Sequence, residues 1–139
     1  IGGVATAGIP HAAWVAERLN LPLIYVRAKP KDHGAGKQIE GRITKDDKVV
    51  LIDDLISTGG SVLKAAEAVE KAGIKVLGVA AIFTYELPAA TENFAKAGLP
   101  LHTLTNYTTL IHQAEKAHIL TAEERESLLT WREDPWAWK

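Results

Sequence analysis

The stretch VVLIDDLISTGGS, residues 49–61, carries the clearest structural pattern in this chain. Its opening run is continuously apolar, as is typical of a strand buried on both faces of a parallel sheet, and it predicts a strand over residues 48–52. Two acids, Asp53 and Asp54, follow this strand directly. A loop of small hydroxyl residues and glycines then enters a helix predicted for residues 62–72. In parallel sheets ligands bind at the carboxyl ends of the strands, so this stretch also predicts a binding site.

The alternation of strand and helix continues on both sides of this stretch. Runs of apolar and β-branched residues predict further strands at residues 21–26, 75–83 and 101–104, and the end of a strand within residues 1–7. Helices are predicted at residues 11–19, 87–97, 108–117 and 121–131, and loops at residues 8–10 and 27–41. Such alternation implies right-handed crossovers. The predicted fold class is therefore α/β, a mostly parallel twisted sheet flanked by helices around a Rossmann-like core.

Length and composition exclude several classes of protein. The 139 residues carry 16 Lys and Arg against 17 Asp and Glu, a balance that predicts one soluble domain over residues 1–139 with no nucleic-acid partner. The chain has no cysteine, which excludes disulfides, thiol nucleophiles and thiolate zinc sites and favours the cytoplasm. The longest apolar run, residues 76–83, is far shorter than the roughly 20 residues of a membrane-spanning helix, so no membrane partner is expected.

The loop after the two acids has the composition of a phosphate-binding site. Gly59 and Gly60 let an anion approach consecutive backbone N–H groups, and the positive end of the following helix attracts it. The segment lacks both GxxxxGK[ST] and GxGxxG, which disfavours a nucleoside triphosphate or a dinucleotide. Asp53 and Asp54 point to opposite sides of an extended backbone, so each is expected to have its own task, one on ribose hydroxyls and one on the loop or a metal-bound water. The alternative is an ordinary strand-to-helix turn with a serine cap.

The segment RAKPKDHGAGKQIEG, residues 27–41, is a second candidate site. A loop of this length inside a small domain is usually functional, and this one is the most basic segment of the chain. Its five basic side chains are Arg27, Lys29, Lys31, His33 and Lys37. Cations on a closing loop would stabilise negative charge that grows on a departing group. The alternative is a solvent-exposed surface loop without a binding or catalytic role.

Together these motifs resemble a known family. The apolar strand, two acids and an STGGS loop are similar to the phosphoribosyl pyrophosphate (PRPP) signature of type I phosphoribosyltransferases. Three further segments, GVATAGIPHA (residues 3–12), the basic loop (residues 27–41) and IFTYELPAA (residues 82–90), resemble the orotate-specific bacterial members. The resemblance implies transfer of the 5-phosphoribosyl group from PRPP to orotate, with Mg²⁺ bound together with PRPP. The products would be pyrophosphate and orotidine 5′-monophosphate, the precursor of UMP.

The resemblance also assigns roles to individual residues. It implies a PRPP site made of Arg27, Lys31, His33, Asp53, Asp54, Leu55, Ile56, Ser57, Thr58, Gly59, Gly60 and Ser61. The residues implied to be catalytic are Arg27, Lys31, His33, Asp53 and Asp54. Ser57 would also approach orotate, and residues 5–8 are second-rank candidates near pyrophosphate. Tyr85 is expected either to wall the base pocket or to pack. The family further implies a homodimer in which the loop 27–41 reaches the partner's site.

The expected domain organisation is a single core with three functional segments: a mobile loop 27–41, a PRPP loop 53–61, and a C-terminal helix and tail 121–139. The family's N-terminal hood over the orotate site has no counterpart in the sequence, and residue 1 is Ile, so we expect the natural protein to extend upstream. Some members carry a lysine where this chain has Ala28, with Lys29 one residue later. Two rival functions are a purine-salvage phosphoribosyltransferase and a nucleotide- and RNA-binding regulator on the same fold.

Overall fold

The structure, a computed structural model, describes residues 1–29 and 38–137. Its strands are β1 (Gly2–Val4), β2 (Ile24–Val26), β3 (Ile39–Gly41), β4 (Lys48–Ile56), β5 (Lys75–Thr84) and β6 (Leu101–Asn106). Its helices are α1 (Gly8–Leu19), α2 (Gly60–Lys71), α3 (Pro88–Ala97), α4 (Tyr107–Lys116) and α5 (Ala122–Glu133). The six strands form one sheet in the order β3-β2-β1-β4-β5-β6, in which only the β2–β3 pair is antiparallel. The predicted mostly parallel α/β fold is confirmed.

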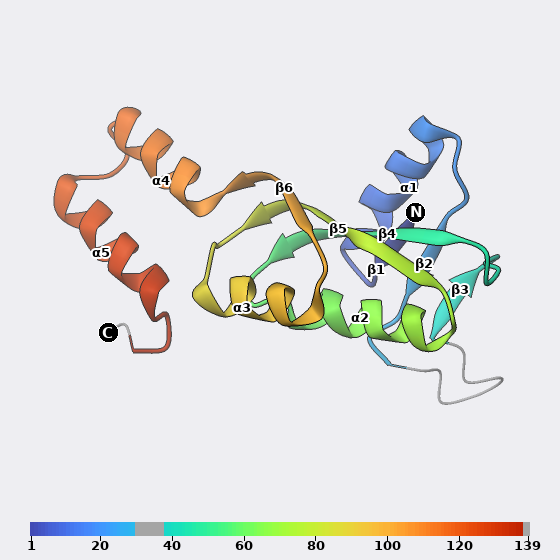
Figure 1. The fold of residues 1–139 in the computed structure, drawn as a ribbon. Coiled ribbons are helices and arrows are strands. Elements are labelled where there is room, and N and C mark those ends of the chain that lie inside the picture. The colour runs from blue at the N-terminus through green and yellow to red at the C-terminus, as the bar shows by residue number, and fades with distance from the viewer. Residues whose placement is uncertain (30–37, 138–139) are drawn as a thin grey trace.

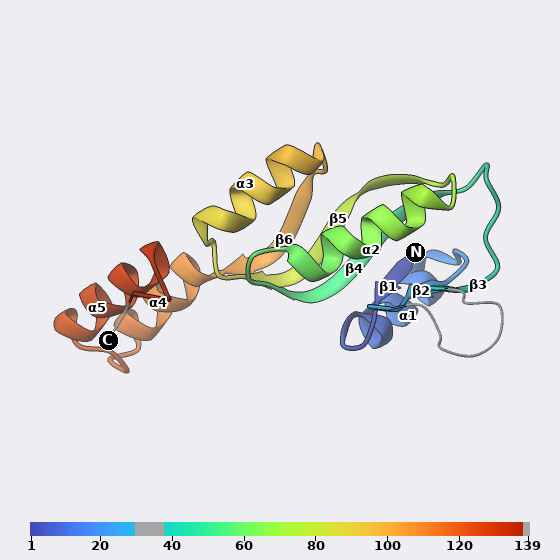
Figure 2. The same ribbon diagram turned by 90° about the horizontal axis from the view of Figure 1, so that it is seen from below.

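The helices form layers on the two faces of the sheet. The helices α2 and α3 cover one face, and α1 packs on β1 and β4 from the other face (Figures 1 and 2). The helices α4 and α5 form a hairpin that lies beyond the carboxyl ends of β4 and β5 (Figure 1). The carboxyl edge of the sheet is therefore flanked by the turns into α1 and α2 and by this hairpin.

The core lies between the sheet and α2. Its most deeply buried side chains are Leu51, Ile56, Val26, Val62, Val69 and Val79. Leu51 of β4 lies opposite Val79 of β5 in the parallel register, and valines at helical spacing on α2 pack on this pair of strands. The continuous apolar run that predicted a doubly covered strand thus forms the centre of the sheet.

Four element boundaries differ from the prediction by three residues or more, and the others by at most two. The strand β4 runs on to Ile56, four residues beyond the predicted end, because its ladder with β5 continues as far as the pair Ile56–Thr84. The helix α1 begins at Gly8, so residues 8–10 are helical; a proline in the first turn needs no N–H partner. The strand β2 starts only at Ile24. The last three residues of the predicted loop 27–41 form β3, which pairs with β2.

The start of α5 is capped as its sequence predicts. The Thr121 hydroxyl accepts a hydrogen bond from the Glu124 backbone N–H, and the Glu124 carboxylate accepts one from the Thr121 backbone N–H, so the capping box is confirmed. The side chain of Asn106 caps α4 by accepting a hydrogen bond from the N–H of Thr109.

None of the described helices combines the length and the apolar character that a membrane crossing requires.

Candidate functional site

The two adjacent acids lie near the carboxyl end of strand β4. Asp53 pairs in register with Ala81 of β5, and its side chain is buried, with 8% of its surface exposed. Asp54 is half-buried. One carboxylate oxygen of Asp53 accepts a 3.0 Å hydrogen bond from the Asp54 backbone N–H. Asp53 is therefore the more buried of the two and is bonded to the backbone, whereas Asp54 is more accessible. The separate tasks of the two acids stay a prediction.

Asp53 has an unusual affinity for protons. Burial raises the pKa of its carboxyl to about 6, and the nearby Asp54 carboxylate adds to the rise, while the backbone N–H of Asp54 opposes it. A carboxyl that titrates near neutrality can exist in both charge states at a physiological pH, which is common in binding and catalytic sites. A ligand hydroxyl that donates to Asp53 would favour its ionised form.

The loop from Ser57 to Gly59 makes the sharp turn into α2. Gly59 is the N-cap of α2 with a φ of +79°, and an added Cβ would lie 2.7 Å from the Phe94 ring, so both its backbone conformation and its packing require glycine. Gly60 differs, because an added Cβ there would meet only the Thr58 hydroxyl at 3.7 Å. The protein's own packing explains Gly59, whereas the open space at Gly60 fits a ligand that approaches the backbone.

Residues close to Gly60 in the sequence carry hydroxyl groups. Ser57 and Ser61 are exposed, and Thr58 is half-buried. No side chain caps the first turn of α2, so its N–H groups remain available to an anion at the positive end of the helix. The expected serine cap of the alternative explanation is absent at this helix, whose N-cap is Gly59. The geometry therefore favours an anion site over an ordinary capped turn.

A loop from the neighbouring strand completes this edge. The strand β1 pairs with β4 through Gly3 and Ile52, which places the residues that follow β1 beside the two acids. Gly8 lies so close that an added Cβ would be 3.1 Å from the Asp53 Cα and closer still to the Ile52 carbonyl oxygen. The Ala5–Thr6 peptide bond in this loop is cis. Residues 5–8 are thus brought to the site, although close packing alone explains the glycine.

The base of the basic loop lies at the same edge, two strands away. Arg27 directly follows β2, and its guanidinium lies 3.3 Å from the Glu40 carboxylate and donates a 3.1 Å hydrogen bond to the Tyr25 hydroxyl. The backbone N–H of Arg27 donates to the Gln38 carbonyl oxygen, and the Gln38 side chain donates back to the Arg27 carbonyl oxygen. These bonds close the base of the loop. Lys31 and His33 lie outside the described residues.

Two residues of α3 that the sequence did not single out support the site. The Asn93 side chain donates a hydrogen bond to the Thr58 carbonyl oxygen, and the Phe94 ring packs beneath Gly59. The sequence gives little indication of this role, because a polar residue such as Asn93 in a helix is usually at the surface and an apolar one such as Phe94 is usually in the core. Only the packing of α3 against α2 brings them to the loop.

Comparison with known proteins identifies the family. Residues 1–121 match the family model of the phosphoribosyl transferase domain. The chain belongs to the phosphoribosyltransferase family. It is 68% identical over 138 residues to orotate phosphoribosyltransferase of Levilactobacillus brevis, an alignment that covers 99% of this chain and 66% of that relative. The resemblance to orotate phosphoribosyltransferases that the motifs predicted is thereby confirmed.

Solved structures confirm the phosphoribosyltransferase fold. The orotate phosphoribosyltransferase of Aeropyrum pernix superposes with a TM-score of 0.71 at 34% identity, over 86% of this chain and 65% of that one. The UMP synthase of Leishmania donovani superposes with a TM-score of 0.77 at 27% identity, over 94% of this chain and 28% of that one. The chain therefore spans about two thirds of the length of its bacterial and archaeal relatives.

Proposed function

We propose that this chain is the PRPP-binding part of an orotate phosphoribosyltransferase, which acts in the cytoplasm in the biosynthesis of UMP. The enzyme transfers the 5-phosphoribosyl group from PRPP to orotate and releases orotidine 5′-monophosphate and pyrophosphate. The observation that carries the proposal is an intact anion loop beside two acids, in a chain 68% identical to a named orotate phosphoribosyltransferase.

In this proposal the carboxyl edge of β4 binds the ribose 5-phosphate portion of PRPP. The half-buried backbone at Gly60 and the hydroxyls of Ser57 and Ser61 take the 5-phosphate, supported by the positive end of α2. Asp54 accepts hydrogen bonds from the ribose hydroxyls. Asp53 holds the backbone through the Asp54 N–H and offers its second oxygen to the ribose.

The base binds next to the loop. The backbone N–H of Tyr85 donates a 3.0 Å hydrogen bond to the Ile56 carbonyl oxygen, so Tyr85 lies across from the start of the phosphate loop. Ser57 approaches orotate from β4, and Tyr85 forms a wall of the base site from β5. The two sequence-based explanations of Tyr85, a pocket wall or a packing residue, are compatible because one edge of its ring can pack while another contacts a ligand.

The chemistry requires cations at the leaving group. Bond exchange at the anomeric carbon passes through an oxocarbenium-like state in which negative charge grows on the departing pyrophosphate, so cations aimed there lower the barrier. We assign this role to Arg27 and Lys31, with Arg27 exchanging Glu40 for the pyrophosphate. His33 donates a proton or a hydrogen bond to the same group. A closed loop would also exclude water from the activated sugar.

Mg²⁺ fits this site as an ion carried by the substrate. Within residues 1–29 and 38–137 no three carboxylate, histidine or cysteine side chains lie close enough to hold a metal. Asp53 and Asp54 point to opposite sides of β4, so they do not hold the ion as a pair. Mg²⁺ would take most of its ligands from the phosphates and water, with one of the two carboxylates acting through a metal-bound water. When bound, the ion would neutralise charge on the pyrophosphate, while Asp54 would hold the ribose in place.

Two further features belong to the proposal. The enzyme is a homodimer in which the loop 27–41 closes over the partner's pyrophosphate site. In keeping with the family resemblance, residues outside these 139 supply a hood over the orotate site. The chain spans 66% of the length of its Levilactobacillus relative. Without them we expect the phosphate loop to bind ribose 5-phosphate while orotate affinity and turnover are largely lost.

The test is a substrate panel on the complete natural chain that contains these residues, with the 139-residue chain beside it and the mass of each sample measured first. The loss of orotate absorbance is followed with PRPP and Mg²⁺, and chromatography detects products from hypoxanthine, guanine and adenine. We expect consumption of orotate alone by the complete chain. Consumption of a purine would replace the proposal with purine salvage, and no consumption of any base would favour a regulator.

A further inference from the structure

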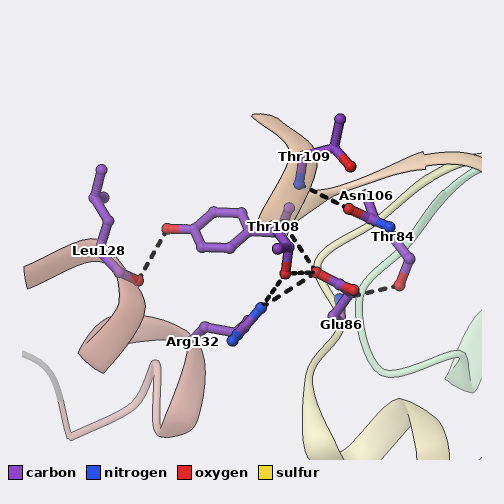
Figure 3. A network of polar contacts seen from close by, with 8 residues as sticks. Thr84, Glu86, Asn106, Thr108, Thr109, Leu128 and Arg132 are labelled. Atoms are coloured by element: carbon purple, nitrogen blue, oxygen red, sulfur yellow. Dashed lines mark hydrogen bonds and ion pairs between the residues drawn. The ribbon is translucent and has the colours of Figure 1, made fainter. Parts of the chain in front are cut away.

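A ring of polar contacts joins the C-terminal hairpin to the end of β5 (Figure 3). The Glu86 carboxylate accepts a 2.8 Å hydrogen bond from the backbone N–H of Thr108, in the first turn of α4, and a second one from the Thr108 hydroxyl. Arg132 of α5 donates to the same carboxylate at 3.2 Å and to the Thr108 hydroxyl at 2.6 Å. Three elements that are distant in sequence therefore meet at Glu86.

The site favours an ionised Glu86. Burial raises the pKa of its carboxyl, but the hydrogen bonds from Thr108 and the positive charge of Arg132 outweigh that effect and hold the pKa below its usual range. The positive end of α4 also attracts the carboxylate. Of the ion pairs between described residues, the Arg132–Glu86 pair is the one that connects the hairpin to the sheet.

An aromatic cluster lies beside this polar ring. The Tyr85 ring contacts Trp131 of α5 with centroids 5.6 Å apart and Tyr107 of α4 with centroids 6.1 Å apart. Tyr107 and Trp131 contact each other at 5.3 Å, and Tyr107 is buried with its hydroxyl donating to the Leu128 carbonyl oxygen. Tyr85 and Glu86 form the turn that follows β5, called the β5 turn below. These two consecutive residues thus contact two consecutive residues of α5, Trp131 and Arg132.

The turn that the hairpin holds lies next to the phosphate loop. Thr84 is paired with Ile56, and the N–H of Tyr85 donates to the Ile56 carbonyl oxygen, one residue before Ser57. Glu86 has a φ of +56°, a left-handed conformation that non-glycine residues adopt only at a cost. Its N–H donates to the buried Thr84 hydroxyl, and its side chain is fixed by the hairpin. These contacts maintain the unusual turn.

From this geometry we propose that the hairpin α4–α5 is a positioning element for the base site, and that Arg132 is its positioning residue. By holding Glu86, Arg132 fixes the turn that carries Tyr85, and Trp131 fixes the ring itself. The substrate it affects is the base, orotate, and this assignment rests on the proposed function. PRPP binds on β4 and the turn into α2, which the hairpin reaches only through the turn after β5, so we expect the PRPP affinity to depend much less on Arg132.

The hairpin offers a matched control on the same helix. Arg125 of α5 lies 3.3 Å from Glu115 of α4 and 3.7 Å from Glu126, so it stabilises the hairpin internally and does not contact the β5 turn. Arg132→Ala removes the contact with the sheet, whereas Arg125→Ala removes a contact within the hairpin. Arg132→Lys keeps the charge and loses the planar guanidinium, which makes it the conservative variant.

The experiment measures steady-state kinetics of these three variants in the complete natural chain, with orotate and PRPP varied separately and the melting temperature recorded. We expect Arg132→Ala to raise the KM for orotate about tenfold and to change the KM for PRPP less than about twofold. Arg132→Lys should raise the KM for orotate by a smaller factor. Arg125→Ala should have the same two KM values as the parent enzyme. Equal changes in both KM values, or a lower melting temperature with both unchanged, would overturn the positioning role. An unmodified enzyme that does not consume orotate would overturn the proposed function and with it the substrate assigned here.

Discussion

The side-chain amide of Asn93 donates a 2.9 Å hydrogen bond to the carbonyl oxygen of Thr58, which joins α3 to the phosphate loop. The next residue, Phe94, is buried and packs against Gly59. Two consecutive residues of α3 therefore contact the backbone of the loop, one at Thr58 and one at Gly59. A loop that is ordered before the ligand arrives loses less conformational entropy on binding.

We expect Asn93→Ala to weaken the loop without unfolding the domain. Removing the donor leaves the Thr58 carbonyl without this partner, which costs about 0.5–1.5 kcal/mol of stability. The same loosening should lower the affinity for ribose 5-phosphate about threefold to tenfold, measured by calorimetric titration. Lys96→Ala on the same helix is the control, because its exposed pair with Glu92 at 3.9 Å contributes little. Unchanged affinity in Asn93→Ala would show that the loop is ordered by other contacts.

The two loop glycines should respond in opposite ways to alanine. Gly59→Ala forces a side chain into a φ of +79° and against the Phe94 ring, so we expect a loss of about 1–3 kcal/mol in the free energy of unfolding. Gly60→Ala places a methyl group at an ordinary contact distance of 3.7 Å from the Thr58 hydroxyl, so it should leave stability unchanged or raise it by about 0.5 kcal/mol. Denaturant unfolding of both variants measures this contrast.

For ligand binding we expect Gly60→Ala to have the larger effect, although Gly59→Ala has the larger effect on stability. A methyl group on Gly60 occupies the space assigned to the 5-phosphate, so Gly60→Ala should bind ribose 5-phosphate about tenfold more weakly or worse, while remaining folded. If Gly60→Ala binds as well as the parent protein, the phosphate does not approach the backbone at that residue.

The sequence predicted the strand and loop at the centre of the site, but it did not predict the contacts that hold them in place. The apolar run before Asp53 and the small residues after it predict a buried strand and an anion loop because both depend on local composition. The extension of β4 to Ile56 was missed, since it depends on pairing with β5. Asn93 was also missed, because its partner Thr58 is remote in sequence. The same holds for Arg132, whose contact with Glu86 requires the hairpin to fold back.

The raised pKa of Asp53 predicts that stability falls as the pH rises. The folded protein holds a proton on Asp53 up to a pH of about 6, whereas the unfolded chain releases it near 3.8. The contribution of this group is fully present below pH 3.8 and is lost as the pH rises through about 6, a difference of about 2–3 kcal/mol. Asp53→Asn, which keeps an acceptor for the Asp54 N–H, should be free of this loss.

The measurement is denaturant unfolding of the parent and Asp53→Asn at pH 4 and pH 8. We expect the variant to be the more stable protein at pH 8 by up to about 2–3 kcal/mol, and the gap to shrink toward pH 4. A gap that is the same at both pH values would mean that Asp53 has no raised pKa in the folded state. The variant should nevertheless bind ribose 5-phosphate more weakly, because it lacks the charged acceptor.

Lys31 tests the assignment of the basic loop. If its ammonium acts on charge that develops on pyrophosphate, Lys31→Ala should lower kcat about tenfold or more and change the affinity for PRPP much less. Turnover of the complete chain and PRPP titration give the two numbers, and Lys29→Ala shows whether the neighbouring lysine shares the role. A loss of affinity with kcat unchanged would make the loop a clamp on the bound substrate.

Asp54 provides the sharpest test of the ribose site. Its side chain is half-buried at the end of β4, outside the apolar core, so Asp54→Ala should leave the unfolding free energy within about 1 kcal/mol of the parent. Loss of an ionised acceptor for ribose hydroxyls should nevertheless reduce kcat/KM for PRPP by at least about a hundredfold. Asp54→Asn preserves shape and removes charge, so its activity separates the two requirements. A variant that folds and turns over like the parent would remove Asp54 from the site and leave the ribose to Asp53.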